Sequence, residues 1–457
     1  MARIKKIQLC NFKCFEDTGA LDIAKLTILT GANSSGKSSF IYSLLGVLQS
    51  EAFPLNFSIN GKYISMGDFG EVVYSHDKNK DITVNIVINK DETDYDFSLV
   101  LGYLDGLNLP VVKGIKCKSD FFEYAITAHC CENEKIIHTL NFKCDSSANL
   151  KAQVEQKKMM SSFKEMFARQ GLPDEFLNKI DDIIQEFFKP IDVQELQMSV
   201  NDKNQVSVME NNPATIQMGV AMSMGKEALD ELRSNFNYIS SYRTHSQRSY
   251  LEKQIENGRI KPSGEGFVDE ILTWRTSNRI QYERLLGNLR KLGILYDIEP
   301  TRQDGGEINV KVKVTKESAK SNLSDVGFGI SQVIPVILAD MELTNGSTLF
   351  SSQPEIHLHP SIQANLADYF VGQIKNADKN YIIETHSEYL LNRLRLAIVK
   401  GQLKAEDIRV YYMNQENGKS SIHDVVFGKD GTVSGAPKDF FETYMMDTMN
   451  IAMEAAE

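Results

Sequence analysis

Long apolar runs are absent from this sequence of 457 residues. No stretch reaches the roughly 18 apolar residues that a helix needs to cross a membrane, so we expect no membrane span. The short basic segment at residues 1–6 is not followed by the apolar core of a secretory signal. Cysteine is also scarce, with six residues and no C-x-x-C pair, which argues against a disulfide framework. We therefore expect reduced thiols and a cytoplasmic protein.

Net positive charge is lacking as well. The chain has 61 acidic and 50 basic residues, and its formal net charge is -11. A surface of this sign does not attract nucleic acid over its whole area, so DNA binding would need a local basic patch. Residues 238–250 contain several basic and aromatic side chains, namely Tyr242, Arg243, His245 and Arg248. This segment could be a solvated connection, or it could form a surface for a partner or nucleic acid.

Side-chain periodicity predicts a mixed α/β fold. Over residues 82–142, apolar and polar side chains alternate in short segments, which predicts an antiparallel sheet with one wet face. Residues 152–190 and 266–293 show the helical period. In the last third, short apolar strands such as Tyr381–Ile383 are separated by helical stretches, and this order implies a parallel sheet.

A glycine-rich loop connects an apolar strand, Leu26–Thr30, to a helical stretch at residues 40–48. Residues 31–38 read GANSSGKS and match G-x-x-x-x-G-K-[ST] at every fixed position. The glycines let backbone N–H groups point at phosphate oxygens, and the following helix adds its positive end. The lysine of this motif reaches the β- and γ-phosphates, and its last hydroxyl binds Mg²⁺. We predict ATP and Mg²⁺ as ligands, with Ser38 on the metal and a binding loop of Asn33, Ser34, Ser35, Gly36, Lys37, Ser38 and Ser39.

Four further segments carry a family resemblance. Ile7–Phe15 looks like the opening strand of the SMC, RecF and OLD ATPases, the ABC-type branch of P-loop proteins, where the basic residue at Lys13 often lies near the nucleotide. Residues 322–332, with the string VGFGISQ, resemble the signature loop, which in that family contacts ATP held by the opposite subunit. Gly329 and Ser331 would make that contact, and Ser324 is the alternative serine. We expect the signature helix at Val333–Asp340, with Pro335 in its first turn.

The other two segments lie near the C-terminal end of the sequence. Residues 353–360, QPEIHLHP, resemble the segment after the Walker B strand, and residues 383–388 resemble the segment of the switch histidine, here His386. The two histidines of the first segment lack a third ligand at metal spacing, so we favour structural roles for them. Lys37 and His386 are about 350 residues apart, yet in that family both face one nucleotide.

The resemblance implies an ABC-type ATPase head. Its N-terminal half would comprise residues 1–150, with the P-loop and the antiparallel β subdomain. A helical insertion would follow at residues 151–300. The C-terminal half would comprise residues 301–457, with the signature, Walker B-like and switch-histidine segments.

The sequence departs from the family at the Walker B strand. Ser352 stands where the metal-holding acid is expected, and Gln353 stands where a catalytic glutamate is common. A glutamine can position water but cannot accept its proton, and general-base help is worth roughly 10²–10⁴-fold in rate. Glu355 and Glu384 lie nearby as partial substitutes. We predict tight ATP binding with slow hydrolysis, with Gln353, Glu355 and His386 as the catalytic candidates.

The strings VGFGISQ, QPEIHLHP and ETHSE are most similar to stand-alone AAA-type ATPases of bacterial anti-phage systems, such as the Septu ATPase. This resemblance implies a homo-dimer or higher homo-oligomer with ATP sandwiched between heads. It also implies a separate HNH-type nuclease partner, with nucleic acid reached through the complex. A DNA repair or recombination ATPase similar to SMC and RecF is the alternative, and a module that binds ATP without hydrolysing it is a third.

Overall fold

The computed structural model describes residues 1–51, 53, 56–104, 109–130, 136–144, 157, 160–161, 191–200, 206–208, 213–252, 259–416, 419–437, 440 and 453. It separates into two compact units. The first unit combines Met1–Asp22 with Tyr42–Ser234, and the second combines Ile23–Ile41 with Asn235–Glu457. The units are interleaved along the chain, and the three successive segments suggested by the sequence stay a prediction.

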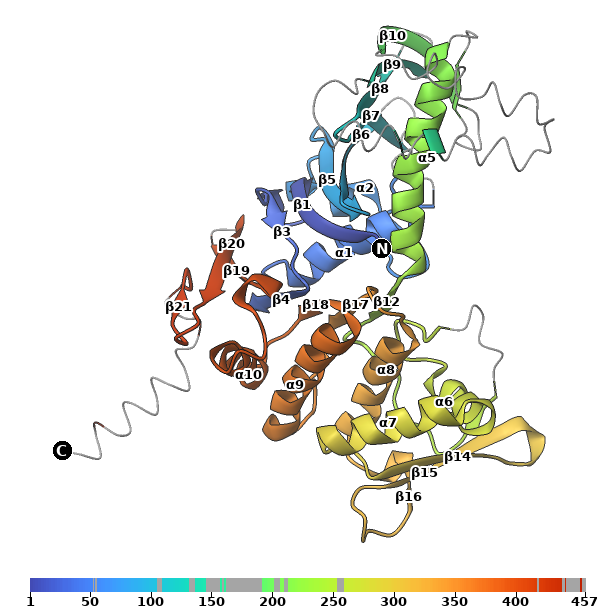
Figure 1. Cartoon of the computed structure of the whole chain (residues 1–457), viewed down its shortest axis with the longest axis vertical. Coiled ribbons are helices and arrows are strands. Elements are labelled where there is room, and N and C mark those ends of the chain that lie inside the picture. Colours follow the sequence, from blue (N-terminus) through green and yellow to red (C-terminus); the bar gives the residue numbers. More distant parts are fainter. Residues whose placement is uncertain are drawn as a thin grey trace. The chain divides into compact units, whose positions relative to one another are not determined.

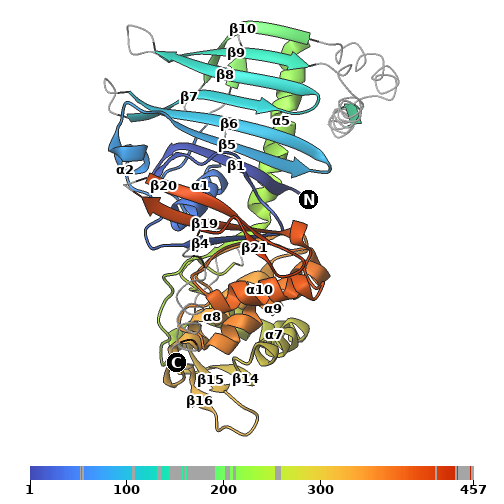
Figure 2. The same ribbon diagram turned by 90° about the vertical axis from the view of Figure 1, so that its left-hand side faces the viewer.

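The first unit contains an antiparallel sheet of ten strands, with β11-β10-β9-β8-β7-β6-β5-β1-β2 in order and β3 beside β1 (Figure 2). Buried and partly exposed residues alternate along β5, which confirms the sheet predicted over residues 82–142. The strands are β1 (Arg3–Phe12), β2 (Phe15–Asp17), β3 (Leu21–Asp22), β5 (Ile82–Lys90), β6 (Thr93–Leu104), β7 (Leu109–Lys118), β8 (Phe122–Cys130), β9 (Ile136–Cys144), β10 (Ile191–Val200) and β11 (Val206–Val208).

Helices accompany this sheet. The long helix α5 (Pro213–Ser234) packs against β5 and β9 and so crosses the sheet. The short helices α2 (Phe69–Val72) and η1 (Tyr74–His76) follow each other before β5. The helix predicted over residues 152–190 lies outside the described residues, apart from positions 157, 160 and 161.

The second unit is built on a seven-stranded sheet in the order β12-β17-β18-β4-β19-β20-β21. The first five strands are parallel, which confirms the parallel sheet expected from the last third of the sequence. The last two strands return antiparallel. The strands are β4 (Leu26–Gly31), β12 (Phe236–Ile239), β17 (Thr348–Ser352), β18 (Asn380–Glu384), β19 (Ile408–Glu416), β20 (Lys419–Phe427) and β21 (Val433–Ser434).

Apolar side chains from this sheet share one core with those of the helices of the unit and of a small second sheet. Figure 1 labels these helices as ribbons. The helices are α6 (Phe267–Ser277), α7 (Arg279–Leu292), α8 (Phe328–Glu342), α9 (Pro360–Ala377) and α10 (Glu388–Val399), with the 3₁₀ turns η3 (Asp304–Gly306), η4 (Leu323–Asp325) and η5 (Ala405–Asp407). The small sheet comprises β13 (Tyr250–Leu251), β14 (Asp297–Arg302), β15 (Glu307–Lys313) and β16 (Ser321–Asn322).

Two helix predictions need correction. The stretch at residues 266–293 forms two helices, because Asn278 leaves helical geometry and its side chain caps the second helix at the N–H of Gln281. The signature helix α8 starts at Phe328 and not at Val333, because Gly327 serves as its N-cap. Pro335 therefore lies inside the helix and not in its first turn, and it leaves one helical carbonyl without its usual N–H donor.

A buried polar cluster joins α8 to its neighbours. The carboxylate of Asp340, near the end of α8, is fully buried and accepts hydrogen bonds from the hydroxyls of Tyr369 on α9 (2.5 Å) and Tyr381 on β18 (2.8 Å). The ammonium of Lys379 lies 3.2 Å from the same carboxylate. A buried charge is tolerated when it is paired and hydrogen-bonded in this way. The cluster fixes the signature helix against the strand that ends at Glu384.

Candidate nucleotide site

The glycine-rich loop leaves the parallel sheet at the end of β4 and leads into helix α1 (Lys37–Gln49). Gly31 has φ +126°, and a Cβ atom there would lie 2.0 Å from the carbonyl oxygen of Met413 on β19. Only glycine fits this close approach, which is fixed by a hydrogen bond from Ala32 N–H to the same oxygen (3.1 Å). Ser34 and Gly36 also have positive φ, so the loop curls before the helix begins. This is the geometry expected of a phosphate-binding loop.

The predicted loop residues differ in exposure. Asn33 and Ser34 are exposed, and Ser38 and Ser39 are half-buried. Ser35 is buried and donates its hydroxyl to the carbonyl of Ala32 (2.8 Å).

Lys37 lies within the loop with only 4% of its surface exposed. Its ammonium donates to the carbonyl oxygens of Gly31 (3.2 Å) and Ala32 (2.5 Å). Burial lowers the pKa of Lys37 from its ordinary value, while the nearby charge of Glu384 opposes that shift. Because little water screens this ammonium, its charge acts more strongly on neighbouring groups than that of an exposed lysine.

Three parallel strand ends meet beside this loop. In the sheet, Ser352 at the end of β17 pairs with Glu384 at the end of β18, and Glu384 pairs with Leu29 of β4. Ser38, in the first turn of α1, donates its hydroxyl to the carboxylate of Glu384, with distances of 2.9 and 3.1 Å to the two oxygens. Residues separated by 346 positions in the sequence are thus in direct contact.

Glu355 is buried behind this edge. Its Oε1 atom accepts hydrogen bonds from the hydroxyl of Thr385 (2.7 Å) and the backbone N–H of His386 (3.0 Å), whereas Oε2 is buried without a partner. Burial raises the pKa of Glu355, and these hydrogen bonds and the charge of Arg243 partly oppose the rise. The side chain therefore holds the backbone at the predicted switch histidine.

Gln353 directly follows the end of β17, and His386 lies two residues beyond the end of β18. Partial burial and then the charge of Lys37 lower the pKa of His386, which favours the neutral imidazole, a form that can both donate and accept a hydrogen bond. Gln353 has φ +47°, and its backbone N–H donates to the carbonyl of Glu384 (2.7 Å). The catalytic roles given to Gln353, Glu355 and His386 stay predictions.

The signature segment packs against the segment after β17. A Cβ atom at Gly329 would lie 2.2 Å from the carbonyl oxygen of His357, so glycine allows the two backbones to touch. The ring of Phe328 contacts those of His245 and His357, with centroid distances of 4.8 and 4.9 Å. His357 thus has an aromatic partner, and its structural role stays a prediction.

The two candidate serines of the signature segment have local partners. Ser331 is buried and donates its hydroxyl to the carbonyl of Phe328 (2.8 Å). Ser324 donates its backbone N–H and its hydroxyl to the side-chain oxygen of Asn322 (2.9 Å each). Whether Gly329, Ser331 or Ser324 contacts a nucleotide stays a prediction.

Arg243 has a role that the sequence did not reveal. It is 4% exposed, and its guanidinium donates to the carbonyl oxygens of Ser240, Gln332, Ser352 and Gln353 at 2.7–3.1 Å. It thereby joins the signature helix to the end of β17. The reading of this segment as a solvated connection is wrong for Arg243, although Tyr242 is 81% exposed. No local pattern distinguishes such a buried arginine from its exposed neighbour Arg248.

Lys13 belongs to the first unit. It follows β1 with φ +50°, and its backbone N–H donates to the carbonyl of Val72 (2.6 Å). Burial lowers the pKa of its ammonium, and the charge of Glu71 partly opposes this effect. Its predicted contact with the nucleotide stays a prediction.

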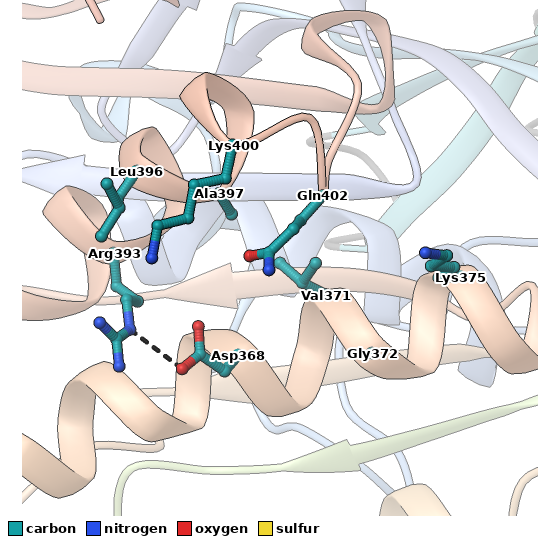
Figure 3. A pocket seen from close by; sticks show the side chains of 9 residues that line it. All are labelled: Asp368, Val371, Gly372, Lys375, Arg393, Leu396, Ala397, Lys400 and Gln402. Atoms are coloured by element: carbon teal, nitrogen blue, oxygen red, sulfur yellow. Dashed lines mark hydrogen bonds and ion pairs between the residues drawn. The ribbon is translucent and has the colours of Figure 1, made fainter.

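A separate surface pocket of about 310 Å³ lies between α9 and α10 (Figure 3). Lys375, Arg393 and Lys400 line it, and Arg393 is paired with Asp368 at 3.0 Å. No predicted site residue is among those that line it.

A family model described as an AAA ATPase domain matches residues 3–391. This chain belongs to the AAA ATPase domain family. Members of this family bind nucleotide, in agreement with the predicted loop. The ATPase has no match among curated proteins. The structure shows the α/β fold predicted from the sequence, with a P-loop on a parallel sheet and a separate antiparallel sheet.

Among solved structures, similar chains include three SMC head domains. One is an Smc head from Pyrococcus furiosus, bound to the C-terminal domain of ScpA. It shares 11% identity at a TM-score of 0.41, and the match covers 100% of this chain and 100% of that one. An SMC head from Thermotoga maritima shares 10% identity at a TM-score of 0.37, over 92% of this chain and 98% of that one. An SmcHead bound to the C-winged helix domain of ScpA shares 9% identity at 0.39, over 93% and 98%. At this level of similarity they bear on neither the function nor the partners of this ATPase.

No helix among the described residues of this ATPase is long and apolar enough to cross a membrane. Likewise, no group of three or more His, Cys, Asp or Glu side chains that could hold a metal is found among them. Histidines 357 and 359 therefore belong to no such cluster in the described part of the chain. Besides side chains such as that of Ser38, any metal at the phosphate loop would need further oxygen atoms from a nucleotide or from water.

Replacing Arg243 with alanine will destabilise the second unit of this ATPase. The change leaves four carbonyl oxygens without their donor, so we expect a loss of about 3 kcal/mol or more in the free energy of unfolding. Trp274, the single tryptophan of the chain, is buried in α6 and reports this unit by fluorescence during urea unfolding.

Tyr242→Ala is the matched control, because this neighbouring side chain is 81% exposed and its loss should change stability by about 0.5 kcal/mol at most. If Arg243→Ala costs no more than this control, Arg243 does not hold the strand end in place.

Proposed function

We propose that this chain is the ATP-binding subunit of a bacterial anti-phage defence system, in which two copies close on ATP and regulate a separate nuclease. The observation that carries the ATP-binding part is the meeting of Lys37, Ser38 and Glu384 at one edge of the parallel sheet. The lysine supplies positive charge, the curled loop supplies backbone N–H groups, and helix α1 starts directly at the loop.

The pairing of two heads is supported by the start of α8. Its N-cap, Gly327, is exposed and has no side chain with which to cap the helix. The first N–H groups of the helix therefore lack a side-chain cap from this residue. A helix N-terminus of this kind favours phosphate. In ABC-type ATPases the signature segment contacts ATP held by the opposite subunit, and the same use of Gly329 and neighbouring residues would join two copies of this chain.

The defence role rests on the resemblance of the VGFGISQ, QPEIHLHP and ETHSE strings, and the neighbourhood of the gene tests it. An HNH-type nuclease encoded beside this chain would support it, and the absence of any nuclease gene would count against it. The SMC- or RecF-like repair function requires DNA binding by the isolated chain, which should then weaken steeply with salt. The net charge of -11 disfavours that outcome.

Lys37→Ala will weaken ATP binding. Hydrogen bonds to charged groups are worth about 1.5–3 kcal/mol, so we expect the dissociation constant to rise roughly 10- to 150-fold. Calorimetric titration with ATP checks the affinity, and light scattering checks whether ATP doubles the mass of the wild type but not of the variant.

Lys25→Ala is the matched control, because Lys25 lies in the same unit but pairs with Asp378 at the surface. An ATP affinity for Lys37→Ala within twofold of the control would remove the basis of the proposed function.

ATP turnover by the wild type will be slow. Gln353 stands at the end of β17 without a carboxylate to take the proton from water, so we expect phosphate release below about 1 s⁻¹, the low end of ordinary turnover. Gln353→Glu should raise the rate by roughly 10²-fold or more if the base is what is lacking. Gln303→Glu, in an exposed turn, serves as the control. Wild-type release near about 10 s⁻¹, a typical enzyme rate, would refute slow hydrolysis.

A further inference from the structure

The end of β17 offers hydroxyl groups where a magnesium site needs a carboxylate. Ser352 is 3% exposed, and its hydroxyl has no hydrogen-bond partner; the same holds for the hydroxyl of Ser351. Mg²⁺ at a nucleotide is usually bound through one or two carboxylates together with phosphate oxygens and waters. Neither serine supplies the negative charge of such a ligand, so the charge must come from another residue.

The neighbouring strand supplies that charge. Glu384 lies directly opposite Ser352 in the register of the parallel sheet, and β18 stands between β17 and β4. The carboxylate is thus one strand closer to the phosphate loop than a side chain at position 352. Its two oxygens lie 2.9 and 3.1 Å from the hydroxyl of Ser38, the residue predicted to bind the metal.

We propose that Glu384 is the carboxylate that holds the magnesium ion of bound ATP, in place of the acid that β17 lacks. The proposal rests on the ATP-binding function proposed above. Two neighbouring ligands of an octahedral Mg²⁺ with bonds of about 2.0–2.1 Å are separated by about 2.9 Å, and this matches the spacing of the Ser38 hydroxyl and the Glu384 oxygens.

Glu355 is unsuited to this task. Both glutamates are nearly fully buried, with 6% of Glu355 and 5% of Glu384 exposed, so their hydrogen bonds distinguish them. One oxygen of Glu355 already accepts two hydrogen bonds, from the hydroxyl of Thr385 and the backbone N–H of His386. Glu384 instead accepts its described side-chain hydrogen bond from Ser38, whose hydroxyl can rotate to present a lone pair to a cation. The two glutamates therefore differ in role: Glu355 holds the backbone, and Glu384 faces the loop.

The experiment compares Glu384→Gln with the wild-type full chain. Affinity for a fluorescent ATP analogue is measured in excess Mg²⁺ and in EDTA. The ratio of the two affinities, here called the metal benefit, is the factor by which Mg²⁺ strengthens nucleotide binding. Mn²⁺ affinity in the presence of a non-hydrolysable ATP analogue is measured by electron paramagnetic resonance. In Glu384→Gln we expect Mn²⁺ affinity to fall roughly 10- to 100-fold, since loss even of a partner behind the ligands costs this much. ATP binding in EDTA should remain.

Two further variants sharpen the test. Glu406→Gln, in the exposed turn η5 just before β19, makes the same change near the start of β4 rather than at its end and should keep wild-type Mn²⁺ affinity. The double variant Ser352→Glu with Glu384→Gln moves the carboxylate to the adjacent strand end, and restored Mn²⁺ affinity there supports the proposal.

Mn²⁺ affinity of Glu384→Gln within twofold of the wild type overturns the proposal, and so does slower hydrolysis with an unchanged metal benefit, because Glu384 would then act on water. If the wild type itself binds no ATP, the proposed function fails first, and this result is distinguishable from a failure of the metal assignment alone.

Discussion

The contact between the Ser38 hydroxyl and the Glu384 carboxylate is the interaction on which the site depends. It joins the first turn of the helix after the phosphate loop to the end of the strand beside β4. Because β18 pairs directly with β4, the contact needs no long side chain, and its position is fixed by backbone register. The sheet therefore places the Glu384 carboxylate beside the phosphate loop.

Two buried polar residues support this edge from behind. Arg243 binds the carbonyls at the end of β17 and in the signature helix, and Asp340 ties the far end of that helix to β18 and α9. Both are desolvated charges, which are stable only when their partners stay in place. Helix α8 is thus held at both ends against the strands that form the predicted site.

The sequence predicted what local pattern encodes. The phosphate loop follows a fixed spacing of residues, and the sheet over residues 82–142 follows a period of two. Both could therefore be predicted from the sequence. The packing roles of Arg243 and Gly329 could not be predicted, because each depends on contact with backbone far along the chain. That backbone lies about 90 residues from Arg243 and about 30 residues from Gly329. Pro335 was misplaced because Gly327 starts the helix earlier than the apolar run suggested. The Ser38–Glu384 contact follows from strand order, which periodicity alone does not reveal.

A double-mutant cycle between Ser38 and Glu384 tests the central claim most directly. Ser38→Ala, Glu384→Gln and the double variant are compared with the wild type for the free energy of binding ATP in excess Mg²⁺. If both side chains serve one metal-bound nucleotide, their effects are not additive, and we expect a coupling energy of about 1 kcal/mol or more. Additive effects, with coupling below about 0.3 kcal/mol, would show that the two residues act independently and would contradict the account.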